Sequence, residues 1–103
     1  MTYHSAVLDA LGDPTRRLIV ERLAAGPLPV GELAAAIPVS RPAVSQHLKV
    51  LKAAGLLLDE AAGTRRIYRL NPSALAAVRD YFDDFWQRAL EQYAATIESG
   101  EPT

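Results

Sequence analysis

The pattern of apolar and polar residues predicts a chain built mainly from helices. A short helix is expected over residues 5–11. A second begins at Pro14, because Asp13 can cap it and proline fits the first turn. The apolar stripe of this second helix consists of Leu18, Ile19 and Leu23. Residues 30–37 are expected to form a third, short helix, which Pro38 ends with a turn.

The fourth predicted helix, over 41–54, is the most informative segment because its two sides differ in chemistry. Ser40 is a good N-cap for it, and Gly55 is expected to end it in a left-handed conformation. At about 100° per residue, the apolar side gathers Val44, His47, Leu48 and Leu51. The opposite side gathers Pro42, Ser45, Gln46, Lys49 and Lys52. The first side suits a protein core, whereas the second offers hydrogen-bonding groups and positive charge to DNA.

A β-hairpin and a long helix complete the pattern. Residues 56–58 are apolar enough to begin a strand, and after a turn residues 65–70 alternate between charged and apolar, so that Ile67 is expected to point inward. Asn-Pro then starts the last helix, expected over 72–98. The order of four helices, a hairpin and a long helix predicts a mainly α fold, a winged helix-turn-helix with a two-stranded wing over 59–70.

Composition indicates a single globular domain over 1–103, with half of the residues hydrophobic and 22% charged. The absence of cysteine excludes disulfides and thiolate metal sites. No apolar run approaches the roughly 18 residues that a membrane span requires, and the first residues do not read as a signal peptide. We therefore expect a cytoplasmic protein without a membrane partner.

The net charge of −1 conceals an uneven distribution of charge along the chain. Residues 1–71 hold nine Lys and Arg against six Asp and Glu, a net charge of +3. Residues 72–103 hold two against six, a net charge of −4. A basic N-terminal part and an acidic C-terminal part are typical of a protein that binds phosphate through one end and uses the other end for a different task.

Five features occur along the chain in a distinctive order. They are the strings LGDPTRRLIVERL, GELAAAI, SRPAVSQHLKVLKAAGLL and GTRRIYRLNP, followed by an aromatic last helix. Together they resemble the ArsR/SmtB family of bacterial winged-helix transcriptional repressors, over roughly residues 5–95. The resemblance implies a homodimeric repressor that binds an inverted-repeat operator in double-stranded DNA.

The polar side of the fourth helix and the hairpin carry groups suited to DNA. Gln46 can pair with adenine, Ser45 can bond a base edge or phosphate, Arg41 can reach guanine or phosphate, and the lysines suit phosphate. The hairpin arginines could lie along the phosphates or enter an adjacent minor groove. The resemblance adds Ser40 and His47, although helical geometry places His47 nearer the core edge. The candidate DNA-binding residues are Ser40, Arg41, Pro42, Ser45, Gln46, His47, Lys49, Lys52, Thr64, Arg65 and Arg66. The alternatives are a solvated polar face and solubilising arginines, and not every hairpin arginine can reach DNA.

The aromatic stripe of the last helix is too large for the core of one subunit. A dimer would cover it, and the resemblance implies pairing through the first and last helices, residues 1–12 and 72–98. The candidate interface residues are Leu8, Leu11, Tyr81, Phe82, Phe85, Trp86 and Tyr93. A monomeric core and an aromatic pocket for a small apolar effector are the alternatives.

Metal binding and catalysis lack the residues that they need. Metal sensors of the family carry Cys-x-Cys where this chain has Ala34-Ala35-Ala36, and no histidine follows Pro72. The carboxylates of the last helix are Asp80, Asp83, Asp84 and Glu91, which fit a solvated acidic face. We expect no metal, no cofactor and no enzymatic activity, since no catalytic motif is present.

A second function also fits the charge distribution. The winged helix could bind protein instead of DNA and use the acidic, aromatic last helix as its docking surface. For the repressor, the release signal could be a small molecule, a partner protein or the protein's own concentration, and the sequence does not choose among them.

Overall fold

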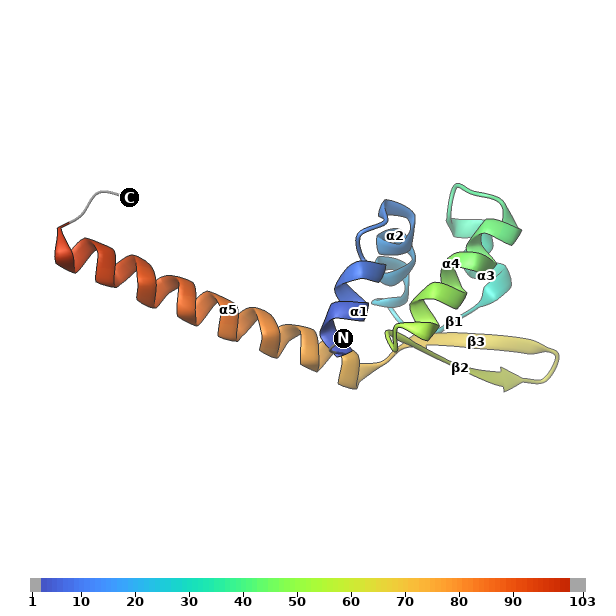
Figure 1. Cartoon of the computed structure of the whole chain (residues 1–103). Helices are drawn as coiled ribbons and strands as arrows, with labels where there is room; N and C mark the ends of the chain where they lie inside the picture. Colours follow the sequence, from blue (N-terminus) through green and yellow to red (C-terminus); the bar gives the residue numbers. More distant parts are fainter. Residues whose placement is uncertain (1–2, 101–103) are drawn as a thin grey trace.

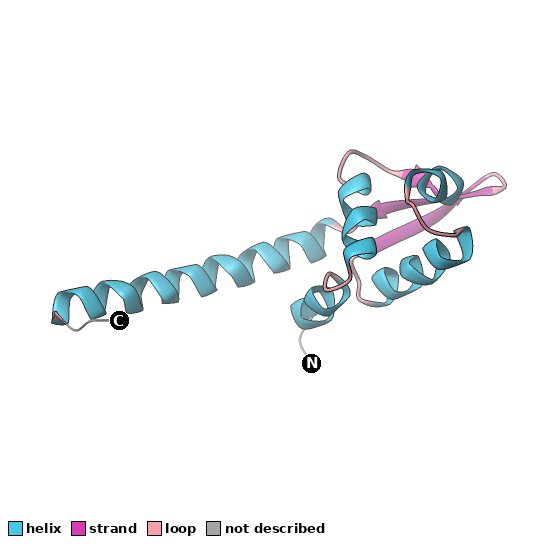
Figure 2. Ribbon diagram, turned by 90° about the horizontal axis from the view of Figure 1, so that it is seen from above, coloured by secondary structure: helices cyan, strands magenta, loops and turns pink. Residues whose placement is uncertain are grey.

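The computed structural model describes residues 3–100, which form a helical body with a small sheet and one long projecting helix (Figures 1 and 2). The elements are α1 (Tyr3–Ala10), α2 (Pro14–Leu23), β1 (Leu28–Pro29), α3 (Val30–Ala36), α4 (Arg41–Ala53), β2 (Leu57–Ala62), β3 (Arg65–Leu70) and α5 (Pro72–Ser99). This order confirms the predicted winged helix-turn-helix. The β2–β3 turn and the far end of α5 lie at opposite ends of the molecule, which measures 64 × 26 × 25 Å.

Three of the helices, α2, α4 and α5, begin after residues whose side chains satisfy free backbone N–H groups. Asp13 accepts hydrogen bonds from the backbone N–H groups of Thr15 and Arg16, at 2.8 and 3.0 Å. Ser40 caps α4 and Asn71 caps α5 in the same manner. These caps confirm the starts expected from Asp-Pro, Ser-Arg-Pro and Asn-Pro, since each motif supplies an acceptor and a proline compatible with the first turn.

The bounds of several helices differ from the predicted ones by one or two residues. Gly55 adopts a positive φ of 84° directly after α4, which confirms it as the terminator. The predicted third helix ends one residue early, at Ala36, and α1 begins at Tyr3 rather than at residue 5. Cap and terminator residues locate an element, while the last turn depends on neighbouring contacts.

The core is assembled from α1 to α4, the start of β2 and the first turns of α5. Its buried side chains are Val7, Ala10, Ile19, Leu23, Leu33, Ile37, Val44, Leu48, Leu51, Leu56, Leu57 and Ala74. The prediction that Leu18 belongs to the apolar stripe of α2 is wrong, because 44% of its surface is exposed. Ile19 and Leu23 lie about 40° apart around the helix, whereas Leu18 lies about 140° from Leu23. Leu18 therefore lies outside the narrow buried face of α2.

The sheet contains a strand that the sequence pattern did not predict. β3 lies between β1 and β2, and both neighbours run antiparallel to it. Residues Leu28 and Pro29 pair with Tyr68 and Ile67, but two residues that include a proline carry no alternating pattern. The prediction that Ile67 faces the core is also wrong, because Tyr68 and Leu70, on the other face of β3, pack against the core.

α5 is 28 residues long, and its beginning packs against the body. Ala74 is buried and Val78 packs against the core, and α5 contacts α1. Beyond these residues the helix extends away from the other elements (Figure 1). No helix within residues 3–100 has the length and apolarity to cross a membrane.

Replacing Leu51 with alanine should lower the free energy of unfolding by about 2–5 kcal/mol, because the truncation leaves a cavity under α4. Leu18→Ala is the matched control and should cost less than about 1 kcal/mol, since that side chain is largely in solvent. Urea unfolding at one fixed protein concentration measures both. Equal losses would contradict this account of the core.

Candidate nucleic-acid interface

α4 presents the two faces that its sequence predicts. Val44, Leu48 and Leu51 are buried against the body. Ser45, Gln46 and Lys49 are exposed, as are Arg41 and Pro42 in the first turn. The buried face anchors the helix, so the polar face has a fixed direction toward solvent.

His47 occupies the border between these two faces. It is half-buried, and its Nδ1 lies 3.5 Å from Nη1 of Arg16 on α2. Nε of Arg16 in turn donates to the carbonyl oxygen of Ala10, at 2.6 Å. This location agrees with the position at the core edge expected from helical geometry. A contact between His47 and DNA stays a prediction.

The turn of the hairpin lies close to the start of α4. Thr64, Arg65 and Arg66 line a cleft of about 370 Å³ together with Arg41 and residues 29–32. Candidate DNA-binding residues from two distant parts of the sequence therefore share one concave surface. The charged residues in its lining are Glu32 and three arginines.

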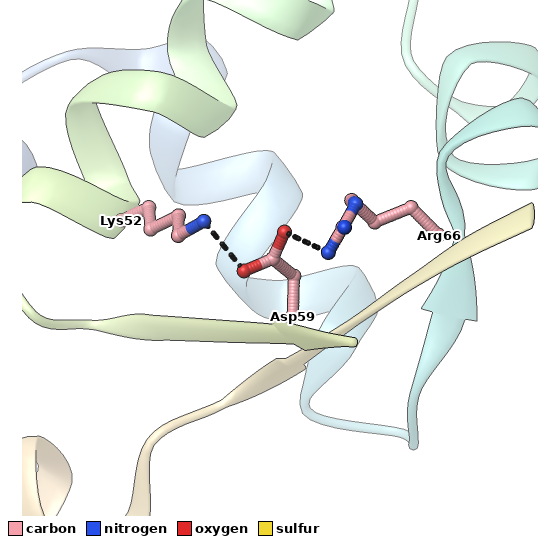
Figure 3. A network of polar contacts seen from close by, with 3 residues as sticks. All are labelled: Lys52, Asp59 and Arg66. Carbon is pink, nitrogen blue, oxygen red and sulfur yellow. Dashed lines mark hydrogen bonds and ion pairs between the residues drawn. The ribbon is translucent and has the colours of Figure 1, made fainter. Parts of the chain in front are cut away.

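Two of the candidate cations are bound within the protein. Nζ of Lys52 lies 2.7 Å from Oδ1 of Asp59, and Nη1 of Arg66 donates to Oδ2 of the same carboxylate at 3.0 Å (Figure 3). The Asp59 side chain is only 6% exposed, whereas those of Lys52 and Arg66 are about half exposed. Sequence reasoning did not single out Asp59. The sequence feature that could have identified it is its position two residues after Leu57, which places the carboxylate on the inward side of a strand.

Other candidate cations are available to a ligand. Within the described range 3–100, Arg41, Lys49 and Arg65 take part in no ion pair or side-chain hydrogen bond, and all three are exposed. They come from the first turn of α4, its middle and the start of β3. Positive charge without an internal partner is thus spread over both elements of the interface.

The far part of α5 carries an exposed apolar surface. Its large exposed side chains are Phe82, Phe85, Trp86, Leu90, Tyr93 and Ile97. Tyr81 is half-buried, with its ring 5.5 Å from that of Phe82. Leu8 and Leu11, the candidates near the N-terminus, are half-buried and Leu11 packs on the core. Leu90 and Ile97 extend the stripe beyond the residues singled out from the sequence.

The acidic residues of α5 lie along an exposed helix. Asp84 pairs with Arg88 at 3.2 Å, and Glu91 accepts a hydrogen bond from Gln87. Across the described part of the chain, no group of three or more His, Asp or Glu side chains is arranged to hold a metal ion. The expectation of metal-independent control stays a prediction.

Comparison with known proteins gives the family. Residues 13–57, which span α2 to the start of β2, match the model of the arsR family of bacterial regulatory proteins. The chain is 67% identical over 90 residues to the HTH-type transcriptional regulator Rv2034 of Mycobacterium tuberculosis, covering 87% of this chain and 84% of that protein. This protein belongs to the ArsR family. It is therefore a winged helix-turn-helix DNA-binding regulator of transcription.

Two further transcriptional regulators support the same conclusion. The transcriptional repressor SdpR of Bacillus subtilis is 38% identical over 69 residues, covering 67% of this chain and 77% of the repressor. The solved structure of an ArsR-like transcriptional regulator from Rhodococcus sp. RHA1 superposes with a TM-score of 0.84 at 28% identity. The match covers 98% of this chain and 95% of that one, so the likeness includes α5. Transcriptional regulators are a non-enzymatic class.

The cap of α2 beside His47 makes stability depend on pH. The backbone hydrogen bond from Arg16 lowers the pKa of the Asp13 carboxyl. Partial desolvation opposes this, while the Thr15 hydrogen bond and the charges of His47 and Arg16 add to it. A lowered folded pKa means that the stabilisation is present above the unfolded value of about 4 and is lost as the pH falls through the folded pKa.

Asp13→Asn should keep the cap but remove this titration, because asparagine also caps helices. We expect the urea midpoint of the wild type to fall more steeply than that of Asp13→Asn between about pH 5 and pH 3. Asp13→Ala should be less stable than both at neutral pH, since the cap itself is lost. Parallel curves for the wild type and Asp13→Asn would contradict the role of the ionised carboxylate.

Proposed function

We propose that this regulator is a homodimeric repressor that binds an inverted-repeat operator. α4 of each subunit enters one of two successive major grooves, about one helical turn of DNA apart, and the β2–β3 hairpin follows the flanking backbone. The observation that carries the proposal is the exposed face of α4, where Ser45, Gln46 and Lys49 lie on a helix anchored from behind by three buried side chains.

The chemistry of this face supports different roles for its residues. The Gln46 amide can donate to and accept from an adenine edge, which distinguishes base pairs. Lys49, Arg41 and Arg65 supply positive charge to phosphates, which positions the protein but does not read sequence. The full set proposed to contact DNA is Ser40, Arg41, Pro42, Ser45, Gln46, His47, Lys49, Lys52, Thr64, Arg65 and Arg66.

The apolar stripe of α5 supports the proposed dimer. Five of its side chains fall within about 80° around the helix, namely Phe82, Trp86, Leu90, Tyr93 and Ile97. A continuous apolar surface of this kind is unfavourable in water and marks an interface. Pairing two copies of α5, with α1 beside them, would cover the stripe. A two-fold axis there would also relate the two α4 helices, as an inverted-repeat operator requires.

Gln46→Ala and Lys49→Ala should weaken binding in different ways. Gln46→Ala should reduce discrimination at particular base pairs by about 1–3 kcal/mol, because a bidentate base contact is lost. Lys49→Ala should weaken operator and random duplexes about equally and make the dependence on salt shallower. Titrations of the variants against both duplexes at several salt concentrations measure the two effects.

A fragment selected from genomic DNA by the wild-type protein serves as the operator in these titrations. An equal loss on operator and random DNA for Gln46→Ala would refute its role in reading bases. If the wild type binds no fragment in a salt-sensitive manner, the repressor proposal fails, and docking of a protein on α5 becomes the better explanation.

Leu90→Asp should convert the dimer to a monomer, because a carboxylate replaces a leucine that is 58% exposed within the stripe. Ala95→Asp is the matched control, since residue 95 lies about 140° around the helix from residue 90 and is also exposed. Sedimentation analysis should give the dimer mass for the wild type and Ala95→Asp only. A wild-type protein that is monomeric at all concentrations would overturn the proposed interface.

A further inference from the structure

One carboxylate joins the end of α4 to the wing, which we define as residues 57–70. Asp59 lies on β2, and each of its oxygens faces a cation from a different element (Figure 3). Lys52 reaches it from the last turn of α4 at 2.7 Å, and Arg66 reaches it from β3 at 3.0 Å. The three side chains form a bridge from helix to hairpin, which we call the Asp59 bridge.

The strand register explains how the bridge is built. Asp59 is opposite Tyr68 and Ala61 is opposite Arg66, so Asp59 and Arg66 are diagonal neighbours on one face of the hairpin. Leu57, two residues earlier on that face, is buried in the core. Because side chains alternate between the two faces of a strand, residue 59 occupies a position that an apolar side chain could also fill. A nearly buried carboxylate there is stabilised because two cations compensate its desolvation.

The outer part of the wing has little else to hold it. Residues 60–66 are all exposed. β1 pairs with β3 at Ile67 and Tyr68, short of the turn, and an isolated two-stranded ribbon is only marginally stable in water. Among the ion pairs of the described residues, the Lys52–Asp59 pair is the one that connects α4 with the hairpin, and the Asp59–Arg66 pair connects its two strands. Core packing and β1 hold the base of the wing, and the Asp59 bridge links α4 to its outer part.

The bridge also affects the charge offered to DNA. Two of the cations near the interface are paired with one nearly buried carboxylate, while Arg41, Lys49 and Arg65 remain without an internal partner. An uncompensated pair of mobile cations would attract the phosphates of any sequence. Held by Asp59, the same two cations attract DNA less and lie in one arrangement.

We propose that Asp59 is a positioning residue for DNA recognition, which sets the angle of the wing to α4 and limits binding to unrelated sequences. This inference rests on the proposed function, because it requires that α4 and the wing engage one duplex together. Asp59 itself touches no DNA. It acts through Lys52 and Arg66.

The variant Asp59→Asn tests this role, because asparagine keeps the shape of the side chain and removes its charge. We expect the ratio of operator to random-duplex affinity to fall about tenfold, the size of one lost charge-assisted interaction. Binding to the random duplex should become tighter and its dependence on salt steeper, since two cations are released. Asp59→Glu, which keeps the charge, should restore part of the ratio.

Glu60→Gln is the matched control. It removes the same single negative charge from the adjacent residue, which is exposed and lies on the other face of β2. This variant should tighten both duplexes alike and leave the ratio unchanged. Amide hydrogen exchange of the variants without DNA should be faster over residues 60–66 in Asp59→Asn alone, which shows that the wing has been released while the core stays folded.

The outcomes separate this inference from the proposed function. If the wild type selects an operator but Asp59→Asn and Glu60→Gln behave alike in the affinity ratio, Asp59 has no positioning role. Unchanged exchange over residues 60–66 in Asp59→Asn would also overturn it. A wild-type protein that selects no DNA would overturn the proposed function, and the inference with it.

Discussion

The burial of one side of α4 is the constraint on which the rest of the structure depends. Val44, Leu48 and Leu51 are held by the core, and each contributes about 1.5–3 kcal/mol when removed from water. A helix has no freedom to rotate once such a stripe is buried. The polar side, with Ser45, Gln46 and Lys49, must then face solvent, so the packing of the body directs the chemistry of the interface.

The extent of the same core explains why the molecule consists of a compact body and a projecting helix. Its side chains come from α1 to α4, from the start of β2 and from the beginning of α5 as far as Val78. The large apolar side chains of α5 from Phe82 onward are exposed, at the opposite end of the molecule from the β2–β3 turn (Figure 1). In the proposed dimer, self-association would take place at one end of the molecule and DNA contact at the other.

Most of the fold could be predicted because its boundaries depend on local chemistry. Asp13, Ser40 and Asn71 are acceptors placed directly before helices, and Gly55 supplies the positive φ that ends α4. The two faces of α4 and the hairpin followed from periodicities of 3.6 and 2. The exposure of Leu18 could not be predicted from periodicity. Whether a residue at the edge of an apolar stripe is buried depends on the width of the helix face that packs against the core.

The sequence by itself therefore determined the order of elements, the polar and apolar faces of α4 and the family, since each rests on residues close together in the chain. Tertiary structure decided the pairing of Leu28 and Pro29 with β3 and the choice of Tyr68 over Ile67 for the core. It also decided that Lys52 and Arg66 share Asp59. These are contacts between separate elements, and side-chain charge reveals that a cation is present but not which partner folding brings within 3 Å of it.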